Sequence, residues 1–178
     1  MHPRTAELLA YLDEHHAVLR GAFDAVPADR RNRRPASDQW SATDVITHLT
    51  LVQRRIATVF AKSVEEARAR GLGAEADASP VLPTLDTARF VDRGRKIAGP
   101  ERINPIHTGD SLEWSDFETA HAALEAALLQ GDGLALSEIT APHPMFGAMG
   151  MYEWIAFAGA HCSRHAAQLR EIEVATRE

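Results

Sequence analysis

The sequence predicts an all-α protein, a four-helix bundle with a long crossover between its second and third helices. Apolar side chains recur at spacings of three and four in four segments, near residues 4–26, 41–70, 115–130 and 151–173. Strand signals are scarce, because β-branched runs are few and no alternating segment is bounded by tight turns. A chain of 178 residues is long enough to bury one core, so we expect a single domain spanning 1–178.

Capping signals mark the starts of the two middle helices. Ser41 and Asp44 form an S-x-x-D pattern, in which each side chain can bond to the backbone N–H of the other residue. Ser115 and Glu118 form an equivalent pattern at the third helix, and Gly131 is placed to end that helix. The two patterns predict helix starts at Ser41 and Ser115.

A long segment, residues 71–114, joins the second and third helices and is interrupted by proline and glycine. Within it, only residues 85–93 have the pattern of a short helix. Connections of this length are uncommon in a compact domain unless they cross over the fold or cover a site. Residues 134–150 form a second, irregular connection that leads into the last helix.

Composition excludes several classes of function. The net charge of −6 argues against general nucleic-acid binding. The single cysteine, Cys162, excludes an internal disulfide and suits a reducing compartment. The N-terminus has no apolar signal core, and an apolar run of about 18 residues is absent. We therefore expect a cytoplasmic protein with neither a nucleic acid nor a membrane as a partner.

Two histidines of the last helix, His161 and His165, are four residues apart and within its buried stripe. At that spacing they are about 40° apart around the helix axis and roughly 6 Å apart along it, so their ring nitrogens can point at one position. A helical H-x-x-x-H pattern of this kind can hold a metal ion. The same residues could instead be core histidines that hydrogen bonds satisfy. A third ligand from another helix would decide between these interpretations.

His48 is the candidate third ligand, because it lies on the buried face of the second helix. The other histidines of interest have simpler interpretations. We expect His15 to pack in the core and His107 to lie at the surface. We expect His121 to pack at a helix seam, although it could also face the metal. His143 could belong to a turn or to the rim of an active site.

The residues around these histidines resemble a known family. Trp40 to Leu49 reads WSATDVITHL, Glu153 to Gln168 reads EWIAFAGAHCSRHAAQ, and residues 143–147 read HPMFG. These segments resemble the W-S-x-x-[DE]-[VI]-x-x-H-L, E-W-x-x-[FL]-x-x-x-H-x-x-[RH]-H-x-x-Q and H-P-x-F-G motifs of the DinB-like metal-binding superfamily. The resemblance covers both histidine-bearing helices and the approach to the last one. It implies a four-helix bundle whose second and third helices run parallel.

A site formed by His48, His161 and His165 suits a borderline divalent ion, with Zn²⁺ or Ni²⁺ first and Fe²⁺ as an alternative. Three protein ligands leave coordination positions open, which is typical of catalytic sites. The sequence shows no general base one turn from these histidines, so the catalytic residues stay unassigned. We expect Arg164 and Gln168 either to orient the histidine rings or to be solvated.

Relatives in this superfamily include transferases that use mycothiol or bacillithiol, so the resemblance implies an enzyme with a small-molecule substrate. The leading hypothesis is transfer of a low-molecular-weight thiol to an electrophile, and metal-assisted hydrolysis is the second. The alternative is a non-catalytic, stress-associated bundle protein that binds metal. Relatives of the family also pair, so a two-fold homodimer is a further expectation.

Overall fold

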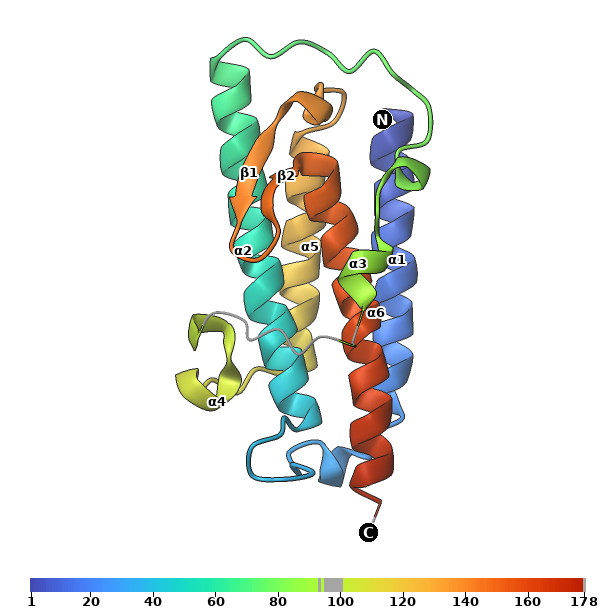
Figure 1. Ribbon diagram of the computed structural model, residues 1–178, viewed down its shortest axis with the longest axis vertical. Helices are drawn as coiled ribbons and strands as arrows, with labels where there is room; N and C mark the ends of the chain where they lie inside the picture. The colour runs from blue at the N-terminus through green and yellow to red at the C-terminus, as the bar shows by residue number, and fades with distance from the viewer. Residues whose placement is uncertain (93, 95–100, 178) are drawn as a thin grey trace.

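The computed structural model describes residues 1–92, 94 and 101–177, and it is an all-α bundle, as the sequence predicts (Figure 1). The four long helices lie side by side along one axis, and they are α1 (Pro3–Asp24), α2 (Ala42–Ala69), α5 (Trp114–Gln130) and α6 (Met151–Ala175). In the described residues, strands occur only in an antiparallel hairpin, made of β1 (Thr140–His143) and β2 (Gly147–Gly150). Short helical turns occupy the connections: η1 (Ala28–Arg30), η2 (Leu82–Thr84), α3 (Ala88–Val91), η3 (Glu101–Ile103), α4 (Pro105–Thr108) and η4 (Leu136–Glu138).

The capping box that the sequence predicts at the start of α2 is present. The Ser41 hydroxyl accepts a hydrogen bond from the Asp44 backbone N–H at 3.1 Å, and the Asp44 carboxylate accepts one from the Ser41 N–H at 2.9 Å. These contacts satisfy two of the N–H groups that the first turn of a helix leaves unpaired. They also hold the first turn of the helix that carries His48.

The predicted start of α5 at Ser115 is wrong. The helix begins at Trp114, with Glu113 as its cap, and the Glu113 N–H donates to Asp116 at 3.0 Å. Glu118, which the sequence pattern pairs with Ser115, instead accepts a hydrogen bond from the Trp114 indole at 2.7 Å. Two overlapping patterns compete here, and we attribute the earlier start to the aromatic packing of Trp114 at the first helical position.

α2 and α5 run parallel, which requires the long crossover. Arg54 lies 3.3 Å from Asp116 near the start of α5, and Arg68 near the end of α2 donates to the Gln130 carbonyl at the end of α5. Successive contacts therefore advance in the same direction along both helices. The connection returns along the bundle from the end of α2 to the start of α5 (Figure 1). Of the short helix predicted at 85–93, the structure contains only α3, and Arg93 lies outside the described residues.

α1 and α6 also run parallel, and they approach closely at Gly159. A Cβ atom added at Gly159 would lie 2.4 Å from Tyr11 Cε1 and 3.0 Å from His15 Cδ2. One turn further along α6, the Ser163 hydroxyl lies 2.6 Å from His15 Nδ1. The absence of a side chain at Gly159 therefore lets the two helices meet at this level.

The buried apolar residues form two clusters, one toward each end of the bundle. In α2 the boundary between them falls between Leu49 and Val52, and in α6 it falls between Ala160 and Cys162. Polar side chains are buried at this level, including Gln53, whose amide approaches the Cys162 sulfur at 3.5 Å. The two histidine-bearing helices thus place their polar residues in a layer between two apolar cores.

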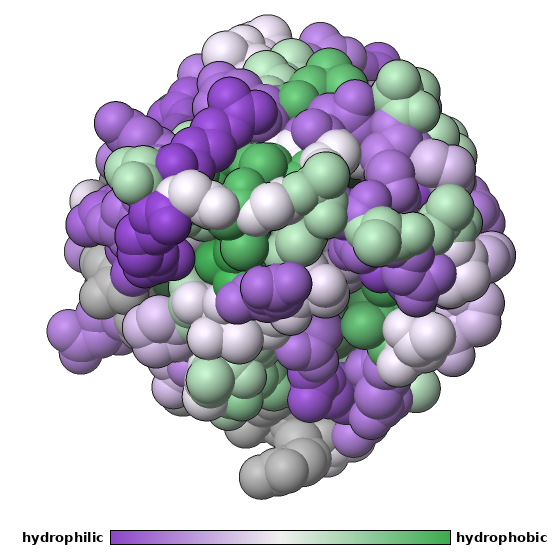
Figure 2. All heavy atoms as spheres, turned by 90° about the horizontal axis from the view of Figure 1, so that it is seen from above, coloured by the Kyte–Doolittle hydropathy of each residue, from purple (hydrophilic) through white to green (hydrophobic). Residues whose placement is uncertain are grey.

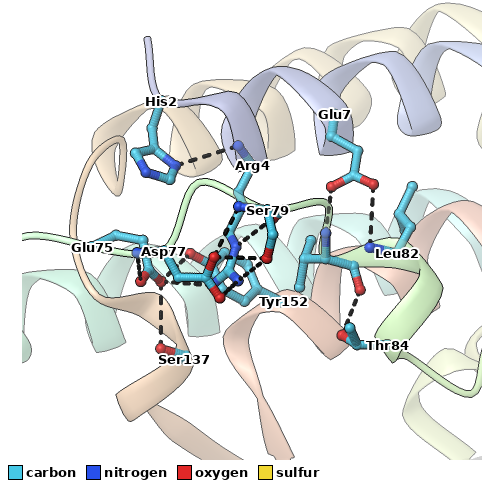
Figure 3. Close-up of polar contacts among 11 residues, drawn as sticks. His2, Arg4, Glu7, Glu75, Asp77, Ser79, Leu82, Thr84, Ser137 and Tyr152 are labelled. Carbon is cyan, nitrogen blue, oxygen red and sulfur yellow. Dashed lines mark hydrogen bonds and ion pairs between the residues drawn. The ribbon is translucent and has the colours of Figure 1, made fainter.

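A partly buried ion-pair network attaches the crossover to the end of the bundle where α1 begins (Figure 3). Arg4, which is 7% exposed, contacts Glu75 at 3.1 Å, also pairs with Asp77, and donates to the Ser79 carbonyl at 2.9 Å. The Tyr152 hydroxyl of α6 donates to the same Glu75 carboxylate at 2.8 Å. One carboxylate therefore joins α1, α6 and the crossover, which directs the rest of the crossover down the bundle.

Hydrophilic residues cover most of this end of the molecule, and hydrophobic residues show through in a central gap between them (Figure 2). Among the residues that the structure describes, every helix is too short or too polar to cross a lipid bilayer.

Candidate metal centre

Three histidine rings from two helices meet between α2 and α6. One ring nitrogen from each of His48, His161 and His165 lies within 4.8 Å of the other two. The Nε2 atoms of His161 and His165 are 3.0 Å apart, and the His48 ring centroid lies 5.3 Å and 5.0 Å from those of His161 and His165. His48 comes from a helix more than a hundred residues earlier, so the convergence is a property of the tertiary fold.

His48 is oriented by the crossover. Its Nδ1 lies 2.7 Å from the Ile103 carbonyl oxygen, at the end of η3. A carbonyl oxygen can only accept, so Nδ1 carries the proton and Nε2 keeps its lone pair. This contact selects the tautomer of His48 that can ligate a metal through Nε2.

His165 is oriented in the same way by a side chain of its own helix. Its Nδ1 lies 2.8 Å from the Gln168 amide oxygen, one turn further along α6. The Nδ1–H therefore donates to Gln168, and Nε2 is free of that proton. The indole ring of Trp40 stacks on the His165 ring at 6.0 Å and lies 4.8 Å from the His48 ring. Trp40 is held in turn by a 3.2 Å hydrogen bond from its indole N–H to Asn104.

His161 has a different environment. Its ring stacks on Phe157 at 4.9 Å, and its buried Nδ1 has no hydrogen-bond partner among the described residues. Burial, followed by the neighbouring charges of His165 and His48, holds the pKa of His161 well below its usual value. Burial likewise lowers the pKa of His48 to about 4. Both rings are therefore neutral at pH 7, which is the protonation state that ligates metals.

The donor set fits a borderline divalent ion. Around an ion held by bonds of about 2.1 Å in tetrahedral geometry, ligand atoms are about 3.4 Å apart. The 3.0 Å separation of the His161 and His165 Nε2 atoms is close to that value. Without an ion, the same 3.0 Å separation lets the His161 Nε2–H donate to the His165 Nε2, and a bound ion would replace this proton between the two rings.

A cavity of about 800 Å³ opens beside the three histidines. Its wall includes the aromatic side chains of Phe90, Phe146, Trp154 and Phe157. Charged side chains of both signs also line it: Arg55, Arg89 and Arg164, and Asp38, Glu101 and Glu171. The cavity can therefore hold a small molecule that combines an apolar part with a polar or charged part.

His143 lies in the wall of this cavity, so it belongs both to the hairpin turn and to the rim of the site. Its Nδ1 accepts a hydrogen bond from the Met145 backbone N–H at 3.2 Å, which leaves the proton on Nε2. Burial, with the charges of Arg55 and Arg89, lowers the pKa of His143 to about 4. At neutral pH this ring is an uncharged hydrogen-bond donor.

The remaining residues that the sequence singles out lie outside the three-histidine group. His15 contacts Ser163 at the seam between α1 and α6, and His121 is buried at the seam between α1 and α5. His107 is exposed, as expected, and also lines the cavity. Arg164 also lines the cavity and donates to the Asp92 carbonyl of the crossover.

Sequence reasoning missed two contacts to the site, both from the crossover. The Ile103 carbonyl leaves no sequence signal, because any residue supplies a backbone oxygen. Asn104 does leave a signal: it precedes Pro105 and its side chain caps α4 by accepting from the Ile106 N–H at 3.2 Å. An N-P pair inside a long connection therefore indicates a local helix start that could position neighbouring residues.

A helical bundle with a buried three-histidine group fits a metal-binding protein. The chain belongs to the DinB superfamily, whose pattern it matches over residues 11–169. It is similar to the uncharacterized protein YuaE of Bacillus subtilis (strain 168), with 26% identity over 158 residues that cover 87% of this chain and 88% of that protein. No solved structure matches the chain.

Proposed function

We propose that the chain binds a divalent metal ion through the Nε2 atoms of His48, His161 and His165. The observation that carries the proposal is the convergence of these buried rings, two of which have their Nδ1 protons committed to the Ile103 and Gln168 oxygens. Membership of the DinB superfamily supports it independently. Zn²⁺ or Ni²⁺ suits three neutral imidazoles best, and Fe²⁺ is an alternative.

We further propose that the site is catalytic. Three protein ligands leave coordination positions open, and the cavity reaches the same histidines. A metal that served only to stabilise the bundle would be better enclosed by a fourth protein ligand. The aromatic wall and the arginines would hold a small-molecule substrate against the site.

The reaction we favour is the transfer of a low-molecular-weight thiol to an electrophile. The ion, when bound, lowers the pKa of a thiol or a water and so supplies a nucleophile at neutral pH. The sulfur forms a bond to the electrophilic carbon, the leaving group departs with its electron pair, and the thiol proton goes to solvent. His143 Nε2–H, in the cavity wall, can donate a hydrogen bond to a substrate oxygen. The thiol must come from a substrate, because Cys162 is 1% exposed and burial raises its pKa to about 12.

Metal-assisted hydrolysis is the second candidate, since the same open site can activate water. A non-catalytic metal-binding bundle is the alternative from another class. The cavity favours the two enzymatic hypotheses, because a metal bound only for stability would not need a space for a substrate. In each case we take residues 1–178 as one domain, located in the cytoplasm.

A thiol panel separates these hypotheses. The zinc- or nickel-loaded protein is incubated with bacillithiol, mycothiol, glutathione or no thiol, together with an aryl halide and a chromogenic ester. A thiol-dependent loss of halide that the His161→Ala variant lacks supports the transferase. Ester cleavage without thiol supports the hydrolase, and turnover of neither substrate by fully loaded protein argues for the non-catalytic alternative. The His2→Ala variant, altered far from the cavity, should behave as wild type.

The pairing of two chains is a separate proposal. Two-fold homodimers are the commonest oligomers of soluble proteins, and the family resemblance suggests one here. Light scattering should then give a mass of about twice the 19.5 kDa of one chain, and a mass near 19.5 kDa would contradict it.

A further inference from the structure

A second group of ionisable side chains lies at the seam between α1 and α5, away from the cavity. Asp13 of α1 and His121 and Glu125 of α5 each offer a ligand atom, and these atoms lie within 4.8 Å of one another. The His121 Nε2 is 3.6 Å from the Glu125 carboxylate. The ring of His16, also on α1, stacks on the His121 ring at 4.6 Å. None of these residues lines the cavity of the three-histidine group.

His121 is the unusual member of this group. It is 7% exposed, and neither of its buried ring nitrogens makes a hydrogen bond with the described residues. A buried polar atom without a partner destabilises a fold, so such atoms normally have a ligand, a water or an ion. The Nε2 atom faces the Glu125 carboxylate at a distance too long for a hydrogen bond. The space between the His121 Nε2 and the Glu125 carboxylate suits a cation that could contact both groups.

The two carboxylates of the group, Asp13 and Glu125, lie close together with no positive charge from His121 between them. Burial, together with the charge and hydrogen bond of Asp13, raises the pKa of Glu125. Negative charges are thus crowded at a place where a neutral imidazole offers lone pairs. The pKa of His121 is lowered to about 4, chiefly by burial, so the imidazole does not itself supply a positive charge at pH 7.

We propose that Asp13, His121 and Glu125 form a second divalent-cation site, for a first-row ion such as Zn²⁺. One imidazole nitrogen and two carboxylate oxygens are a donor set that zinc accepts, with bonds of about 2.0–2.2 Å. Such an ion would bond to His121 and neutralise the two carboxylates together. The site lies outside the three-histidine group in both residues and helices, so it is independent of the function proposed above.

The location of the site indicates a structural effect. α1 packs mainly on α6, and α5 packs mainly on α2, whereas α1 and α5 contact each other much less. A cation held by Asp13 on one side and by His121 and Glu125 on the other would link these two helices. Binding to the folded state alone would stabilise the bundle in proportion to the logarithm of the ion concentration.

Zinc stoichiometry tests the proposal. Metal-free wild type, Glu125→Gln, His48→Ala and the Glu125→Gln/His48→Ala double variant are titrated with Zn²⁺ by calorimetry, and retained zinc is measured by elemental analysis after dialysis. Glu14→Gln is the matched control, because it removes one exposed carboxylate from α1 next to Asp13. Glu125 is partly exposed, so its replacement should leave the fold intact, which circular dichroism checks.

Wild type and the control Glu14→Gln should each retain two equivalents of zinc. Glu125→Gln and His48→Ala should each retain one equivalent, and the double variant should retain none. The melting temperature of His48→Ala should rise with added zinc, and that rise should disappear in the double variant. Glu125→Gln with the same zinc stoichiometry as wild type would overturn the second site. The second site would also be overturned if wild type retained a single equivalent of zinc and His48→Ala retained none. Failure of the three-histidine proposal would give a different result from failure of the second site: His48→Ala would then retain as much zinc as wild type.

Discussion

Acidification of the metal-free protein should destabilise it, and His48 allows the magnitude to be worked out. Burial lowers the pKa of His48 to about 4 in the folded protein, against 6.5 for the exposed ring. Between these values the unfolded chain binds more protons than the folded one, so the free energy of unfolding falls as the pH falls. For His48 alone, going from pH 7 to pH 5 should lower the free energy of unfolding by about 2 kcal/mol.

Urea unfolding of the metal-free protein at pH 7, 6 and 5 measures this effect, with His48→Gln as the matched variant. Glutamine keeps an N–H that can reach the Ile103 carbonyl but does not titrate. The variant should lose about 2 kcal/mol less than wild type between pH 7 and pH 5, and the remaining loss reflects other buried histidines, such as His161. Equal losses in the two proteins, or a wild type that gains stability in acid, would refute the reasoning.

Two further predictions concern the helices that hold the site. Gly159→Ala should destabilise the protein by about 1–3 kcal/mol, because the new methyl group would overlap Tyr11. Gly21→Ala, at a position with open space on α1, should instead stabilise the protein by up to about 1 kcal/mol. Opposite results in thermal unfolding would contradict the close approach of α1 and α6. Gln168→Leu should weaken metal binding by about 10–100-fold, because the His165 Nδ1–H loses its acceptor, and a chelator competition that gives wild-type affinity would contradict this role.

The helices were predictable because each carries its own signal. Apolar spacing located all four, and the Ser41–Asp44 box placed the start of α2 correctly. The start of α5 was not predictable, since two overlapping capping patterns compete there and the choice depends on tertiary packing of Trp114. The β1–β2 hairpin was not predicted either, because its short strands carry no alternating apolar pattern.

The candidate site was predictable where the chemistry lies in side chains. The spacing of His161 and His165 on one helix face suggested a pair, and the buried position of His48 suggested a third member. Their common location depends on the antiparallel packing of α2 against α6, helices that are more than a hundred residues apart, which local sequence does not encode. The Ile103 carbonyl was beyond sequence reasoning, because its role comes from the path of the crossover over His48.

The metal content of the His48→Ala variant tests the central claim most directly. Wild type, His48→Ala and His2→Ala are reconstituted with zinc, dialysed and analysed for bound metal per chain, after circular dichroism has confirmed the helical fold. His48→Ala should hold one equivalent less than wild type, and His2→Ala should equal wild type, because His2 lies at the start of α1 and outside the three-histidine group. A folded His48→Ala protein that holds as much metal as wild type would contradict the three-histidine site.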